Sequence, residues 1–126
     1  MSNLANDAAW ILVMAFALSF VYELYRAGIR AGTSKHDSMR AFVLQIPLYV
    51  AAAIVISSLF AGVGFAEEVG LAFSIGAILV SIFYYNPKII MERQPGIIDW
   101  FEDLVFTGLL FVAAALLLYE VIGRAR

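Results

Sequence analysis

The sequence lacks cysteine, which excludes disulfides, thiolate metal sites and cysteine nucleophiles. Histidine occurs once, at His36, and the two lysines, Lys35 and Lys88, both lie outside the apolar segments. A haem held within a membrane domain usually takes histidine ligands from the helices, and a retinal Schiff base needs a lysine there. His36 and the adjacent Asp37 are too few ligands for a metal. We therefore expect no cofactor, no metal site and no catalytic residue.

Charge is also scarce, at 14% of 126 residues with a net charge of −2, so we expect no nucleic-acid partner. Hydrophobic residues make up 63% of the chain, more than a soluble domain of this size can cover with polar surface. They fall into four blocks close to the ~20 residues that span a bilayer. The sequence predicts one all-α transmembrane domain over 1–126, a four-helix bundle with short links and spans at about 8–25, 42–61, 69–85 and 100–122. Residues 1–7 lack the basic residues of a secretory signal, so we expect the first helix to be retained.

A few residues mark the expected helix ends. Pro47 cannot donate a backbone hydrogen bond and disfavours helix in the residue before it, so the second helix either begins near Pro47 or is kinked there. Asn86-Pro87 is a strong turn signal and predicts the end of the third span. Asp99 and Glu102 have capping-box spacing, which predicts that Asp99 caps the fourth helix while Glu102 reaches back to its start.

Basic residues are concentrated in two of the three links. Six of the eight lie in the first and third links, namely Arg26, Arg30, Lys35, Arg40, Lys88 and Arg93. The other two, Arg124 and Arg126, follow the fourth block. Because positively charged links stay in the cytoplasm, we expect an N-out/C-out topology with the Glu67-Glu68 turn outside. The expected location is a prokaryotic cell membrane.

Small residues recur at helical spacing in three spans. The stripes are Gly70, Ser74, Ala77 and Ser81 on the third span, Ala53, Ser57 and Ala61 on the second, and Ala15 and Ser19 on the first. In lipid the hydrophobic effect does not drive helices together, so close backbone approach along small residues supplies van der Waals contact instead. We expect a compact bundle that packs along these stripes.

Glu23 lies inside the first apolar block, where a charge is expensive. Arg26 follows three residues later on nearly the same helical face, which predicts a Glu23–Arg26 pair whose side chains reach water at the cytoplasmic interface. The alternative interpretation is a proton or cation site lined by Glu23, Tyr22 and Tyr25.

Asp99, Glu102 and Asp103 place three acids at the start of the fourth span. The structural interpretation is that they satisfy the positive end of the helix dipole and pair with the basic first link. The functional interpretation is that they bind a divalent cation through oxygen ligands or dock a basic partner.

No nucleophile–base pair, phosphate loop or clustered metal set is visible, so we do not expect an enzyme. Our first hypothesis is a non-catalytic accessory or assembly subunit of a larger membrane complex. Polar function within a membrane ordinarily leaves a deeply placed ionisable residue, and the sequence shows none in the spans. Its partners would be the lipid bilayer and other membrane subunits. The alternative is a homo-oligomeric channel or transporter for small ions or solutes. A third hypothesis is an enzyme acting on lipid through a metal at the Asp99 turn.

Overall fold

The computed structural model describes residues 3–125, and all regular structure among them is helical. The elements are α1 (Asn3–Gly28), α2 (Met39–Ala61), α3 (Ala66–Val80), the π-helix η1 (Ser81–Ile90), the 3-10 helix η2 (Met91–Arg93) and α4 (Ile97–Ala125). They form four segments that are long and apolar enough to cross a membrane, namely Leu4–Gly28, Met39–Ala61, Ala66–Arg93 and Ile97–Gly123. This confirms the predicted all-α fold with four such helices.

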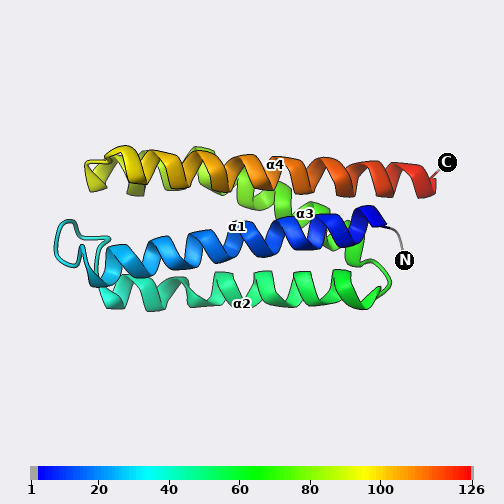
Figure 1. Cartoon of the computed structure of the whole chain (residues 1–126), viewed down its shortest axis with the longest axis horizontal. Helices are drawn as coiled ribbons and strands as arrows, with labels where there is room; N and C mark the ends of the chain where they lie inside the picture. Colours follow the sequence, from blue (N-terminus) through cyan, green and yellow to red (C-terminus); the bar gives the residue numbers. More distant parts are fainter. Residues whose placement is uncertain (1–2, 126) are drawn as a thin grey trace.

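The helices lie side by side as a long bundle (Figure 1). Helix α1 packs against both α4 and α2, while α3 packs mainly against α4 and has a smaller contact with α2. Helix α3 crosses the bundle obliquely, and α1 begins at the same end of the bundle as α4 finishes (Figure 1). The opposite end is formed by the link 29–38, η2 and the turn 94–96. We call it the basic end.

The most extensive contact is between α1 and α4. Small side chains on α1, including Ala8 and Ala15, are fully buried, as are Ala113 and Leu117 on α4. They belong to one continuous apolar core. Small residues let two helix backbones approach closely, so this face of α1 is suited to a long contact with α4. Ser19, the second residue of the predicted α1 stripe, is also buried.

Helix α2 differs from two of the expectations. It begins at Met39, where the Ser38 side chain caps it by accepting a hydrogen bond from the Ala41 amide (3.1 Å), and it continues through Pro47. A start near Pro47 is therefore wrong. The small residues of the predicted α2 stripe lie on the exposed side of the helix, so the expectation that they pack within the bundle is also wrong. They are Ala53, Ser57 and Ala61.

The third helix does not end at Asn86-Pro87, and the predicted turn is wrong. The chain continues as η1 and η2 to Arg93, and it leaves the helix at Gln94, whose φ of 55° is left-handed. At the end of η1 the Met91 amide donates to the Asn86 carbonyl five residues earlier. Such a widened turn accommodates proline, whose ring in a regular α-helix collides with the carbonyl four residues earlier. The extension brings Arg93 to the basic end.

Candidate functional site

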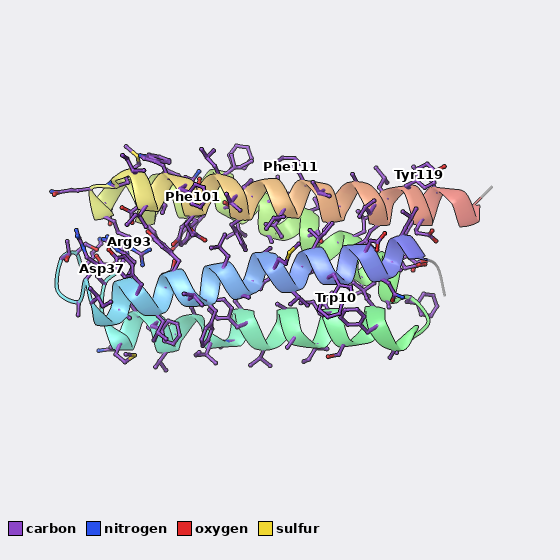
Figure 2. The ribbon with its side chains drawn as sticks, viewed as in Figure 1. Trp10, Asp37, Arg93, Phe101, Phe111 and Tyr119 are labelled. Carbon is purple, nitrogen blue, oxygen red and sulfur yellow. The ribbon has the colours of Figure 1, made fainter. Side chains whose placement is uncertain are left out.

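The link 29–38 folds back over the helix ends and buries Asp37 completely. Gly32 makes the turn possible with a φ of 83°, and its amide donates to the Asp37 carbonyl at 2.7 Å. The Ser34 hydroxyl donates to the Asp37 carboxylate at 2.9 Å. The link therefore holds a carboxylate inside the protein, where Figure 2 shows Asp37 close to Arg93.

Arg26, on the last turn of α1, binds this carboxylate with both arms of its guanidinium. Its Nε and Nη2 atoms donate to the two Asp37 oxygens at 2.8 and 2.6 Å. Its Nη1 atom also donates to Asp99 Oδ1 at 3.4 Å. A bidentate arginine–carboxylate pair is among the strongest hydrogen-bonded arrangements in proteins. Arg26 thereby ties α1 to the link and to the start of α4.

Arg93, at the end of η2, is the second buried guanidinium. Its Nη2 and Nη1 atoms donate to the two oxygens of Glu23 at 2.8 and 3.2 Å. Its Nε atom lies 3.1 Å from Asp37 Oδ1. The Tyr85 hydroxyl, on η1, accepts from Arg93 Nη1 at 2.9 Å and donates to Glu23. Arg93 therefore connects the third segment to both α1 and the link.

These contacts join five residues, which we call the charge cluster: Glu23, Arg26, Asp37, Arg93 and Asp99. The predicted Glu23–Arg26 pair is wrong, because each of the two binds partners far away in the sequence. Glu23 is 3% exposed and does not reach water as expected. Neither Arg93 nor Asp37 was singled out as a site residue from the sequence.

Asp99 has a capping role, although not the predicted one. Helix α4 begins at Ile97, two residues before Asp99, and the Asp99 carboxylate accepts from the Gly96 amide at 2.8 Å. Asp99 is thus the acid that reaches back to the start of the helix, a role assigned to Glu102 by the sequence. The predicted capping box is wrong by one helical turn. The Tyr22 hydroxyl also donates to Asp99, which links it again to α1.

Glu102 and Asp103 lie one turn further along α4, outside the charge cluster, yet they are only 5% and 4% exposed. Both line a cavity of about 310 Å³. Asn86 on η1 lies within reach of Asp103. Within the part of the chain that the structure describes, the Glu102 carboxylate receives no hydrogen bond and forms no ion pair. Glu102 is therefore a buried acid directed at an open space.

The cavity lies between the four membrane-length segments, beside the charge cluster. Its walls are mainly apolar, with Phe16 from α1, Leu48 from α2, Phe73 from α3 and Phe106 from α4. The polar groups on its lining are Ser19, Gln45, Ser81, Tyr85, Glu102 and Asp103. Gln45 and Tyr85 also hydrogen-bond to Glu23, so they connect the cavity to the charge cluster.

The small-residue stripe of the third segment divides between packing and cavity. Gly70 and Ser74 are buried, and a Cβ atom on Gly70 would stand 3.2 Å from the Leu117 side chain. Ala77 and Ser81 instead line the cavity. Gly70 and Ser74 thus allow α3 to approach α4 closely. Ala77 and Ser81 leave space that larger side chains would have filled.

Acids outnumber bases among the buried side chains of residues 4–123. Five carboxyl groups are buried, those of Glu23, Asp37, Asp99, Glu102 and Asp103. The buried cations are the two guanidiniums of Arg26 and Arg93. Burying an unpaired charge costs so much free energy that a group binds a counter-ion or changes its protonation instead. The charge cluster already sets three of these carboxylates against both guanidiniums, so no buried guanidinium is left to pair with Glu102 and Asp103 beside the cavity.

A second group of polar residues lies on the surface of the basic end. Glu92 accepts from His36 Nε2 at 2.7 Å and lies 3.3 Å from Lys35 Nζ. Over the described residues, no group of three or more potential ligands is arranged to hold a metal. The geometry therefore gives no support to a divalent cation at the Asp99 turn.

Comparison with protein-family models, with curated proteins and with solved structures finds no match.

Proposed function

We propose that the chain crosses a membrane four times, with the basic end in the cytoplasm and both termini outside. Large apolar side chains are exposed along the length of the bundle, among them the labelled Trp10, Phe101, Phe111 and Tyr119 (Figure 2). An apolar exterior of this kind suits lipid. The proposed orientation follows from the larger number of basic residues in the first and third links. The majority remains when the buried residues Arg26 and Arg93 are left out of the count. Four exposed basic residues then remain in the two links, namely Arg30, Lys35, Arg40 and Lys88.

We further propose that the protein binds protons or small cations at Glu102 and Asp103 and moves them across the membrane. The observation that carries this proposal is the surplus of buried carboxyl groups beside a cavity. Ionisable residues buried within membrane segments typically belong to ion pathways and proton relays. The hypothesis of an accessory subunit assumed spans without deeply placed charge. The structure instead buries carboxyl groups inside the membrane-length segments, among them those of Glu23, Glu102 and Asp103.

Self-association forms part of the proposed function, because four helices enclose little space for a pathway of their own. The exposed small residues of α2, Ala53, Ser57 and Ala61, offer a face on which a second copy can approach closely. The protein would then act as a homo-oligomer in the lipid bilayer.

Flux measurements on reconstituted protein test this function. Protein-containing vesicles and protein-free vesicles are loaded with a dye sensitive to pH, to Na⁺ or to K⁺ and compared under a gradient of the matching ion. We expect flux with the wild type and loss of most of it in Glu102→Gln, which removes the charge with little change in volume. Glu68→Gln, on the exposed surface at the other end of the bundle, is the matched control and should behave as the wild type. Absence of flux above that of empty vesicles would contradict the proposal, as would full flux in Glu102→Gln.

A further inference from the structure

The cavity has a chemical asymmetry that indicates the class of its ligand. One part of its lining holds the carboxyl groups of Glu102 and Asp103. Most of the remaining wall is apolar, and three of its side chains are phenyl rings, Phe16, Phe73 and Phe106. Small-molecule sites commonly combine an apolar lining with a few placed polar groups, and a volume of about 310 Å³ is at the lower end of their range.

The electrostatic surroundings of Glu102 favour a positive charge in the cavity. The charged groups that act on it include three carboxylates, Glu23, Asp99 and Asp103, against the single guanidinium of Arg93. That guanidinium is already bound to Glu23 by both arms. A cation placed beside Glu102 therefore meets a net negative environment of low polarity, where electrostatic attraction is stronger than in water.

The apolar walls argue against a divalent metal ion as the occupant. Calcium takes six to eight oxygen ligands, and magnesium demands an octahedral set, whereas most of this lining is hydrocarbon. A proton needs no cavity of this size. An organic cation with an apolar body uses both features, because its charge faces the carboxylates and its body contacts the rings. Aromatic faces also attract quaternary ammonium groups directly.

We propose that this cavity binds a monovalent organic cation that carries an aromatic or aliphatic body, with its charge beside Glu102 and Asp103. The inference rests on the proposed function, because it names the cation that the same carboxyl groups take. The Glu102 carboxyl group faces the positive charge of the ligand, and the phenyl rings select a ligand with apolar surface.

Gly76 provides a way to close the cavity without altering its carboxyl groups. This glycine lines the cavity, and a Cβ atom built on it would meet no atom within 4 Å. Gly76→Leu therefore adds its side chain into empty space. Gly108, on the exposed surface of α4, has equally open surroundings, so Gly108→Leu is a matched control outside the cavity.

The test is calorimetric titration of the full chain in lipid nanodiscs with phenyltrimethylammonium. Its neutral carbon isostere, tert-butylbenzene, has the same shape without the charge. We expect phenyltrimethylammonium to bind the wild type and Gly108→Leu, and to bind Glu102→Gln at least about tenfold more weakly, which corresponds to about 1.4 kcal/mol. Gly76→Leu should bind neither compound, and circular dichroism should show that it keeps its helices.

The outcomes separate this inference from the proposed function. Proton or Na⁺ flux without phenyltrimethylammonium binding would leave transport intact and overturn the inference. Binding without any flux would support the inference and contradict transport. Equal binding of the charged and neutral compounds, unchanged in Glu102→Gln, would show a merely apolar cavity and also overturn the inference.

Discussion

Replacing Arg93 by glutamine removes the residue that holds Glu23 and contacts Asp37 at the same time. Arg93 is 1% exposed, and its guanidinium donates to Glu23, to the Tyr85 hydroxyl and to the His36 carbonyl. Without it Glu23 remains buried with no cation in contact. Removing one partner of a buried ion pair typically costs 3–5 kcal/mol, mainly because the other charge is left uncompensated. We expect Arg93→Gln to lower the free energy of unfolding by about that amount.

The assay is equilibrium unfolding in mixed micelles of rising denaturing-detergent fraction, followed by far-ultraviolet circular dichroism. Arg93→Lys keeps the charge but cannot bind both carboxylate oxygens in the same fork, so it should lose about 1.5–3 kcal/mol, the value of a hydrogen bond to a charged group. Arg40→Gln, at an exposed position on α2, is the control and should change little.

A double variant separates loss of the pair from general damage. In Arg93→Gln/Glu23→Gln the orphaned carboxylate is gone, so the double variant should be more stable than Arg93→Gln alone. The reasoning would be refuted if the free energy of unfolding of Arg93→Gln lay within about 1 kcal/mol of the wild-type value, because an uncompensated buried charge costs well above that. It would also be refuted if the losses of the two single variants simply added.

Two further predictions concern packing and topology. Gly70→Val should lower the unfolding free energy by about 1–3 kcal/mol through overpacking, because even a Cβ atom would stand 3.2 Å from the Leu117 side chain. Gly76→Val should have less effect, because Gly76 has open surroundings. Unfolding in denaturing detergent measures both changes. Because the chain has no cysteine, Gly64→Cys and Thr33→Cys each introduce a single label site. A membrane-impermeant maleimide should label Gly64→Cys in intact cells and Thr33→Cys only after permeabilisation; the reverse pattern would invert the proposed orientation.

The apolar blocks predicted the four long helices because bilayer-length hydrophobic runs depend on local composition. The same local reasoning placed the end of the third helix at the Asn86-Pro87 turn signal, and it failed there because the backbone widens and continues to Arg93. Short-range propensity alone does not reveal such an adjustment.

The partners of the buried charges were the least predictable feature. Glu23 was correctly noted as a charge within a span, but its spacing to Arg26 suggested a local pair. Its actual partner, Arg93, is 70 positions away in the sequence. Asp37 is an acid in an otherwise basic link, and this was the only sign in the sequence of its role. An acid in that position is expected where a loop neutralises arginines at the helix ends.

The widened helix η1 has a consequence for how this protein tolerates insertions and deletions. Each turn with five-residue hydrogen bonding holds more residues than an α-turn, so the number of residues between Val80 and Arg93 determines the direction in which Arg93 points. Deleting one polar residue there, with Pro87 and its widened turn kept, would preserve every apolar side chain nearby. It would nevertheless rotate Arg93 away from Glu23. Segment length is therefore under tighter constraint than composition between these two positions.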